Sequence, residues 1–540
     1  MDSTANDWAP NAENKAHVYN TSASNDSITV DYSLDKAAEF NGFSLGINTG
    51  AGNDTVHTIA QGADDFSLPN QQDLQHNVVV NTGEGDDVVW TEGAGGVLIS
   101  TGAGNDTIYS DNSGLSQMNS DLGATWLVNT QNTAFDDLRG NAAGLSSGQT
   151  TPAGNDIPAV LYGAQLTVTL AGASLGGAVT SAAADSFDNG FEGIINLNDI
   201  LGDRVFGDQR DINAAIAQVV NNHKVLSKLL VAENGPDNSL VIRSQVDGQF
   251  EADDLQITLS PAGVSGMSDS AKGRLESAIR EESNDSNFDG TDANLQAVLN
   301  GSTSAAHGIN GIGTGGGVQA DTYTGTASTA DNTGNEINAG SGGDVIVLST
   351  NDVSNETIVF EDNFDRNTVV NFDADGTSTG ADTLDFTAYL GNEEFQGSTS
   401  AESRDTFPTT GVNGGTTVTA NNVITINDFA AGTGNAADET WGGLTAENLL
   451  AAIQNGNNAG YGSIVDGTLD VSANVADLVG NTVKSVVMIE NDNNAGEYKV
   501  FELTGSGVND ANTANEFTDA SLVGIVDFGN EIDASAVNLA

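Results

Sequence analysis

The sequence contains no cysteine in its 540 residues. Disulfide bonds, a thiol nucleophile and thiolate metal ligands are therefore excluded. The metal ligands that the chain offers in quantity are oxygen atoms, and these favour calcium or magnesium over zinc.

Basic residues are also scarce. The chain has 15 Lys plus Arg against 75 Asp plus Glu, which gives a formal net charge of −60. We expect no nucleic-acid partner, because no basic stripe is available to displace counterions from phosphate. Binding to anionic lipid is disfavoured for the same reason. Self-repulsion on this scale opposes compaction unless cations neutralise it.

Long apolar runs and an N-terminal targeting signal are missing. No run approaches the roughly 18 apolar residues of a membrane-spanning helix, so we expect no transmembrane segment. The first residues, Met1–Asp7, form neither a basic region nor an apolar one. Taken alone, this predicts a soluble cytosolic protein. Export directed by an uncleaved C-terminal signal would leave the same pattern.

Catalytic motifs are absent from the sequence. The five histidines form no His-Glu-x-x-His zinc motif, and no Gly-x-x-x-x-Gly-Lys phosphate loop occurs. Carboxylates could pair as a glycosidase acid and base, but with 75 of them the sequence nominates no pair. We therefore expect a protein that is not an enzyme.

Glycine is abundant, at 65 residues, whereas proline is limited to 7. Together with many Asn, Thr, Ser, Ala and Val residues, this composition favours turns and strands over long helices. The fold class that it predicts is mainly β.

One turn repeats almost literally, at residues 48–56, 81–89, 100–108 and 338–346. It has the form Gly-x-Gly-x-Asp followed by β-branched residues. Glycine allows a positive φ and brings carbonyl oxygens close together, and the aspartate adds a charged oxygen. The candidate metal ligands of these turns are Gly50, Gly52, Asp54, Gly83, Gly85, Asp86, Asp87, Gly102, Gly104, Asp106, Gly340, Gly342 and Asp344.

These turns resemble the RTX, or haemolysin-type, calcium-binding repeat. The resemblance implies a protein that folds outside the cell on binding Ca²⁺, with parallel β-rolls, and that leaves the cell by type I secretion. It also implies a C-terminal signal that is not removed. Residues 521–528 and 532–540 are similar to the acidic, apolar ends of such substrates.

The spacing of the turns differs from that of the family. Their aspartates lie at 54, 87 and 106, whereas RTX repeats recur every nine residues. We therefore predict isolated calcium turns that pin separate β units, in place of one long roll. The alternative is that these are plain glycine turns without metal.

Two further stretches copy the start of an EF-hand loop. In the first, Gln296 replaces the acid at the twelfth position; in the second, Asp382 occupies it. Both are candidate calcium sites, and the alternative for each is a solvated turn. The candidate residues are Asp285, Asn287 and Asp289 in the first stretch, and Asn371, Asp373, Asp375 and Asp382 in the second.

The pattern divides the chain into several β-roll-like or β-sandwich-like units with calcium-binding turns, plus an inserted α+β domain. Within that domain we expect strands at 166–170, 240–243 and 255–259, a helix from Ile212 to about Ala232, and a second helix at 270–282. The predicted segments are a flexible N-terminal segment (1–24), a β domain (25–112), a linker (113–160), the α+β domain (161–300), a β domain with a short helix after Thr445 (301–482), and a closing β unit (483–540) with paired strands at 486–489 and 498–503.

The function that these patterns favour is structural. We expect a secreted, calcium-binding protein that assembles with copies of itself into a surface layer, an extracellular filament or a biofilm matrix. The alternative is a calcium-dependent adhesin whose domain at 161–300 binds glycan or protein, including cell-surface polysaccharide. A secreted enzyme with RTX modules is the least favoured alternative.

Overall fold

The fold is known from a computed structural model, and the chain divides into two compact units. Unit 1 comprises residues 1–116 and 323–540, and unit 2 comprises residues 117–322. The structure describes residues 16–31, 44–59, 78–92, 97–111, 125–129, 165–170, 179–180, 195–196, 209–235, 239–245, 254–260, 297–300, 308–311, 333–348, 355–361, 363–373, 382–390, 405–406, 417–418, 423–426, 441–455, 470–471, 482–491, 494–506, 517–529, 532 and 538–539.

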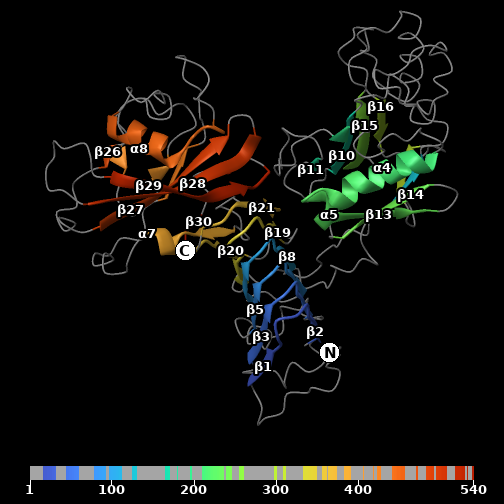
Figure 1. The fold of residues 1–540 in the computed structure, drawn as a ribbon, viewed down its shortest axis with the longest axis horizontal. Coiled ribbons are helices and arrows are strands. Elements are labelled where there is room, and N and C mark those ends of the chain that lie inside the picture. The colour runs from blue at the N-terminus through green and yellow to red at the C-terminus, as the bar shows by residue number, and fades with distance from the viewer. Residues whose placement is uncertain are drawn as a thin grey trace, which may run out of the picture. The chain divides into compact units, whose positions relative to one another are not determined.

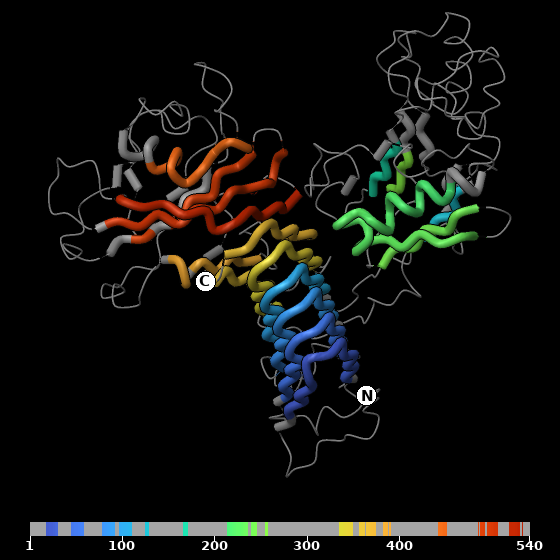
Figure 2. The backbone as a smooth tube through the Cα atoms, viewed as in Figure 1, coloured from blue at the N-terminus to red at the C-terminus, as the bar shows by residue number. Residues whose placement is uncertain are grey.

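Unit 1 is built from coils, each of which gives one strand to each of two parallel sheets. The strands of the first sheet run in the order β1-β3-β5-β7-β18-β20-β22-β30, and those of the second begin β2-β4-β6-β8-β19-β21. Figure 2 shows these coils stacked from the blue part of the tube to the yellow part. The bounds are β1 (Ala16–Asn20), β2 (Ser27–Asp31), β3 (Ser44–Ala51), β4 (Thr55–Ile59), β5 (Val78–Glu84), β6 (Val88–Glu92), β7 (Val97–Ala103), β8 (Thr107–Asp111), β18 (Thr333–Asn338), β19 (Val345–Val347), β20 (Asn355–Val359), β21 (Arg366–Val370), β22 (Thr383–Asp385) and β30 (Asn538–Leu539), with the short helix α7 (Thr387–Leu390) after β22.

The core of the coils lies between the two sheets. Each coil turns β-branched or aliphatic residues inward at every second position, as the alternating burial of β5 illustrates. Val80 and Ile99 from the first sheet meet Val89 and Ile108 from the second, and all are buried in one cluster. This stacking needs inward-facing residues in every coil, which is why the strands read as short Val- and Ile-rich runs.

The second sheet continues beyond β21 into the C-terminal part of the chain (Figure 1). Its further strands are β29 (Phe517–Asp527), β28 (Asn494–Ser506), β27 (Thr482–Asn491), β25 (Val423–Ile426) and β23 (Asp405–Thr406). Strand β28 pairs antiparallel with both β27 and β29, which confirms the predicted pairing of 486–489 with 498–503. The predicted helix after Thr445 is also confirmed, as α8 (Ala446–Asn455), and it packs against β29. Two short strands, β24 (Thr417–Val418) and β26 (Asp470–Val471), pair separately.

Unit 2 combines two mainly antiparallel sheets with two helices. One sheet has the order β13-β14-β9-β17; the other has the order β11-β10-β15-β16, with β12 beside β10. Helix α4 contacts both β13 and β10. The bounds are β9 (Thr125–Asn129), β10 (Gln165–Leu170), β11 (Val179–Thr180), β12 (Ile195–Asn196), α4 (Gln209–Asn222), α5 (Leu226–Leu229), β13 (Leu230–Asn234), β14 (Leu240–Ser244), β15 (Leu255–Ser260), β16 (Ala297–Asn300) and β17 (Gly308–Gly311). The strands predicted at 166–170, 240–243 and 255–259 are confirmed.

The long helix predicted from Ile212 to Ala232 is interrupted after Asn222, resumes as α5 and is wrong from Leu230 onward. Helix α4 ends at Asn222, and residues 230–234 form a strand. The chain turns because the ring nitrogen Nδ1 of buried His223 accepts the amides of Val225 and Leu226 at 3.2 and 3.0 Å. Leu226 and Leu229 are buried in helix α5, and Leu230 is buried in strand β13. The helix predicted at 270–282 lies outside the described residues.

Several predicted boundaries also differ from the structure. Strand β1 begins at Ala16, inside the segment 1–24 that was expected to be flexible. Strand β9 lies inside the predicted linker 113–160, in the middle of a sheet and with Trp126 buried. The β domains predicted at 25–112 and 301–482 are joined, because β18 pairs with β7 and β19 with β8. The fold is mostly β, as expected from composition.

No helix in the described ranges is long and apolar enough to cross a membrane.

Candidate functional site

The four Gly-x-Gly-x-Asp turns lie side by side in unit 1. They connect the two strands of successive coils, and Gly50, Gly83 and Gly102 occupy equivalent positions in neighbouring strands. The turn of residues 338–344 continues the row, because Ser341 bridges to Ala103. The prediction that these turns pin separate β units is therefore wrong. Intervals along the sequence gave no sign of the stacking, because the coils differ in the length of their other connection.

Glycine is required in these turns because successive coils touch there. Gly83 and Gly85 have φ of +102° and +136°. A Cβ added at Gly83 would lie 1.8 Å from the carbonyl oxygen of Gly50, and one at Gly85 would lie 2.0 Å from that of Gly52. Any side chain would push the coils apart. The close approach also places two rows of backbone carbonyl oxygens along the turns.

The aspartate of each turn bonds to the next coil. Oδ1 of Asp54 accepts the amide of Asp26 at 2.8 Å, and Oδ1 of Asp87 accepts the amide of Asp54 at 2.7 Å. The same bond joins Asp87 to Asp106 and Asp106 to Asp344, each at 2.9 Å. We call these five residues, Asp26, Asp54, Asp87, Asp106 and Asp344, the aspartate column. The column ends at Asn367, whose Oδ1 accepts the amide of Asp344 at 2.9 Å.

The second carboxylate oxygen of the column is buried. Asp54, Asp87 and Asp106 are each only 1% exposed. Among the described residues, Oδ2 of these three and of Asp26 is buried and has no hydrogen-bond partner. The Thr82 hydroxyl lies near Asp87, but it donates its proton to the carbonyl oxygen of Thr101. Asp54, Asp87 and Asp106 therefore each have one oxygen that accepts an amide and one oxygen without a donor.

The electrostatics of the column are unfavourable without a counter-charge. Burial raises the pKa of Asp87, and it raises the pKa of Asp106 to about 6, although the amide that each carboxylate accepts and the nearby threonine hydroxyl lower both in part. Neighbouring carboxylates add to the increase. The described coils from residue 16 to 111 contain no lysine or arginine, and the first basic residue along the described stack is Arg366. Protons or cations must therefore balance the charge of the column.

The donor set of the turns suits a hard cation. Carboxylate Oδ2 atoms and the turn carbonyls of residues such as Gly50 and Gly52 are the kind of oxygen ligands that calcium takes. No group of three or more His, Cys, Asp or Glu side chains with metal-binding geometry occurs in the described part of the chain. A cation here would take its further ligands from the backbone or from water.

Asp86 does not belong to the column. It lies in an exposed outer row with Asn25, Asn53 and Asn105. Oδ1 of Asn53 accepts the amide of Asp86 at 3.2 Å, and Oδ1 of Asp86 accepts the amide of Asn105 at 2.8 Å. The outer row therefore ties the rims of the turns together. Of the two neighbouring aspartates predicted as ligands, only Asp87 lies with its carboxylate in the buried column.

Sequence reasoning missed the first turn of the row. Residues 20–26 read Asn-Thr-Ser-Ala-Ser-Asn-Asp, which matches the turn at 48–54 except that Ser22 and Ser24 replace the glycines. Neither serine has a positive φ. Glycine is not needed because no earlier coil stacks there within the described residues. The shared Asn-Thr-x-Ala-x-Asn-Asp pattern was the signal that could have identified Asp26.

The second EF-hand-like stretch lies in a different place, beside β20 and β22. Oδ1 of Asp382 accepts the amide of Glu356 at 3.0 Å, and Oδ2 accepts the amide of Asp373 at 2.8 Å. Burial and nearby Glu356 hold the pKa of Asp382 well above its usual range. Both oxygens of Asp382 thus accept backbone amides, and Asn371 adopts a positive φ of 68° in the turn before it. Asp375 lies outside the described residues, as do Asp285, Asn287 and Asp289 of the first stretch.

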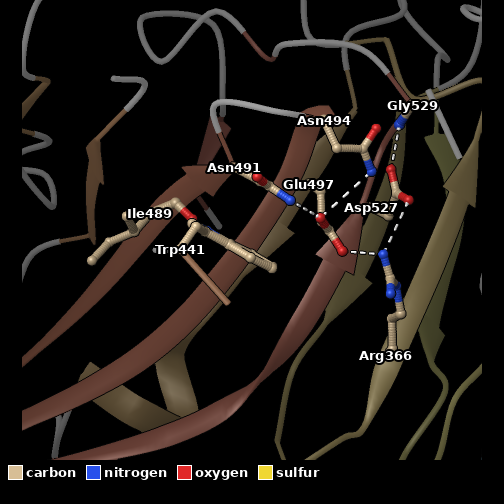
Figure 3. Close-up of polar contacts among 8 residues, drawn as sticks. All are labelled: Arg366, Trp441, Ile489, Asn491, Asn494, Glu497, Asp527 and Gly529. Atoms are coloured by element: carbon tan, nitrogen blue, oxygen red, sulfur yellow. Dashed lines mark hydrogen bonds and ion pairs between the residues drawn. The ribbon is translucent and has the colours of Figure 1, made fainter. Parts of the chain in front are cut away.

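A second buried polar group joins the coils to the C-terminal hairpin (Figure 3). Arg366 of β21 forms an ion pair with Glu497 of β28 and lies 4.0 Å from Oδ2 of Asp527 on β29. Asn491 and Asn494 donate to the other oxygen of Glu497, and Oδ1 of Asp527 accepts the amide of Gly529 at 3.0 Å. Here the chain supplies its own counter-charge. This group therefore differs from the aspartate column.

Comparison of the chain with protein-family models, with curated proteins and with solved structures found no match in any of the three.

Proposed function

We propose that this protein is a secreted, calcium-binding structural protein whose aspartate column holds Ca²⁺ and which assembles with copies of itself outside the cell. The observation that carries the proposal is the column itself. It sets buried carboxylates one coil apart, several with an oxygen that lacks a donor, in coils whose described residues include no lysine or arginine. Cations that bind only the folded chain stabilise it by mass action.

The resemblance of the turns to RTX repeats supports an extracellular setting. Extracellular calcium sites work at about 10⁻⁴–10⁻³ M, a concentration found outside cells and not in the cytosol. The apo chain would then stay loosely folded inside the cell and become ordered after export. The net charge of −60 favours the same order of events, because repulsion opposes compaction until cations bind.

Support for self-assembly comes from the ends of the sheets. Within the described residues, β1 and β2 each pair with a neighbour on one side only. Such edges pair readily with strands of another chain. Val18 on β1 is also 57% exposed.

Electron microscopy of the full chain tests the assembly. We expect ordered lattices or fibres at about 1 mM calcium, and their dispersal by chelator. Magnesium at the same concentration serves as the matched control for ionic strength. Particles that stay monomeric at every calcium concentration would contradict assembly, and isothermal titration without calcium uptake would contradict the ion site.

One observation favours a second candidate function, that of an adhesin. Unit 2 is inserted in a connection between two coils, and such connections commonly carry recognition surfaces. The test is a glycan array probed with the full chain and with a variant in which residues 112–334 are replaced by Gly-Ala-Gly-Gly. Glycan binding that disappears with the replacement would favour the adhesin, and equal signals from both chains would exclude unit 2 as the binding part.

A further inference from the structure

The aspartate column crosses the point at which unit 2 is inserted. Its first three steps join residues that are 28, 33 and 19 positions apart along the chain. The step from Asp106 to Asp344 joins residues 238 positions apart. All of unit 2, residues 117–322, lies between them. This step therefore joins two coils whose sequences are separated by the whole of unit 2.

The strand register shows what the insertion replaces. Glu92 lies opposite Asp111, and Leu98 lies opposite Glu336. Residues 112–335 thus make the connection that residues 93–97 make one coil earlier. The turns at the other end of the coils do not vary in this way, because the first glycine and the aspartate of the turn have the same spacing at 50–54, 83–87, 102–106 and 340–344.

The two ends of the insertion are joined by the strand pairs β7–β18 and β8–β19 and by hydrogen bonds of the turn. The amide of Asp106 donates to Oδ1 of Asp344 and the amide of Val345 donates to the carbonyl oxygen of Asp106, both at 2.9 Å. The amide of Gly343 donates to Oδ1 of Asn105 at 3.2 Å. Bringing together chain ends that are this far apart in sequence costs more entropy than closing the short connections of the other coils.

We propose that a calcium ion between Asp106 and Asp344 acts as a clasp that joins the two ends of the insertion, so that external calcium controls whether these ends are held in neighbouring coils. The inference rests on the proposed function, because it takes the column to be the calcium site. Asp106 contributes a buried Oδ2 that lacks a donor among the described residues, and Asp344 contributes a buried carboxylate from the far end of the insertion.

The step from Asp106 to Asp344 differs from the other steps of the column in what the loss of its ion would release. Loss of an ion between Asp54 and Asp87 loosens two neighbouring coils that a connection of ordinary length still holds together. Loss of the ion between Asp106 and Asp344 removes a link between the part of unit 1 before the insertion and the part after it. Only this step of the column spans unit 2 among the described residues.

Hydrogen exchange measured on the full chain, in chelator and in calcium at ten times its Kd, tests the proposal. The two reporting segments are 52–59, which contains the step from Asp26 to Asp54, and 338–347, which contains Asp344. In the wild type we expect calcium to slow exchange in both segments by about tenfold, because opening then requires release of the ion.

Two matched variants separate the steps. Asp106→Asn keeps an oxygen acceptor for the amide of Asp87 but removes the charge, and it should abolish the slowing at 338–347 while leaving that at 52–59. Asp54→Asn should do the reverse. If Asp106→Asn retains the slowing at 338–347, or if Asp54→Asn removes it there, the clasp is excluded although calcium binds. If calcium slows neither segment in the wild type, the proposed function itself fails.

Discussion

The amide of Asp87 donates a 2.9 Å hydrogen bond to Oδ1 of Asp106 in the next coil, while Oδ2 of Asp106 is buried without a donor among the described residues. The carboxylate of Asp106 thus has two different roles. Its first oxygen holds two coils together, and its second oxygen is available to a cation. Substitutions in the aspartate column can separate the hydrogen bond between coils from cation binding.

At Asp87, alanine and asparagine are expected to differ. Asp87→Ala leaves the buried amide of Asp54 without its acceptor, so it should lower the free energy of unfolding by about 1–3 kcal/mol with or without calcium. Asp87→Asn keeps an acceptor and removes a buried charge, so in chelator its stability should match or exceed that of the wild type. Urea unfolding at several calcium concentrations measures both. An unchanged calcium dependence in Asp87→Asn would exclude Asp87 as a ligand.

Glycine in the turns is expected to be irreplaceable. Gly83→Ala should lower the free energy of unfolding by at least about 3 kcal/mol, because its Cβ would overlap the carbonyl oxygen of Gly50 and its φ is +102°. The matched control is Gly46→Ala in β3, where the added Cβ would lie 3.5 Å from the Val18 methyl groups, an ordinary contact. Thermal unfolding of both variants measures the difference, and equal losses would contradict the stacking of the turns.

The coils of unit 1 are expected to fold and stack without unit 2. We expect a chain in which residues 112–334 are replaced by Gly-Ala-Gly-Gly, the sequence of residues 93–96, to keep the stack, because the register of β7 and β18 then matches that of β5 and β7. Retention of strand signal in circular dichroism and of slow exchange at residues 338–347 would show this. Loss of slow exchange in that segment would mean that unit 2 is needed for closure.

Arg366 is expected to stabilise the C-terminal hairpin by balancing the charge of Glu497 and Asp527. Arg366→Met leaves Glu497 and Asp527 buried without their cation, and it should cost about 3–5 kcal/mol in urea unfolding. The double variant Arg366→Met/Glu497→Gln should recover part of this loss. Arg243→Met is the control, because its ion pair with Glu233 is exposed and should contribute less than about 1 kcal/mol. Similar losses for the two single variants would contradict the assignment.

The stability of unit 2 is expected to depend on pH through His223. Burial lowers the pKa of His223 from 6.5 to about 4 in the folded chain. As pH falls, the unfolded chain therefore takes up a proton before the folded chain does. The stabilisation is complete above pH 6.5 and is lost between about 6.5 and 4, with a total of about 3 kcal/mol.

The variant His223→Gln tests this, because it does not titrate and still offers an oxygen to the amides of Val225 and Leu226. Between pH 7 and pH 4.5 the wild type should lose more stability than the variant in denaturant unfolding. Identical losses would show that His223 does not carry the pH dependence.

The sequence by itself determined the local chemistry of this protein. Gly-x-Gly-x-Asp turns followed by β-branched residues allow positive φ at glycine and favour a strand after the aspartate, because of nearest-neighbour sterics. The same holds for the strands at 166–170, 240–243 and 486–489, whose short runs rich in apolar and β-branched residues favour strands. The mostly β composition also follows from residue propensities.

Only the tertiary structure decided which turns meet. The coil at 338–347 stacks on the coil at 100–109 across 238 positions, and nothing in the local sequence encodes that pairing. It arises because the inward-facing Ile337 and Ile346 must cover the end of the core that Ile99 and Ile108 leave open. Burial of the carboxylate of Asp106 follows from that stacking. A row of separate acidic turns in the sequence thus becomes one buried column in the fold.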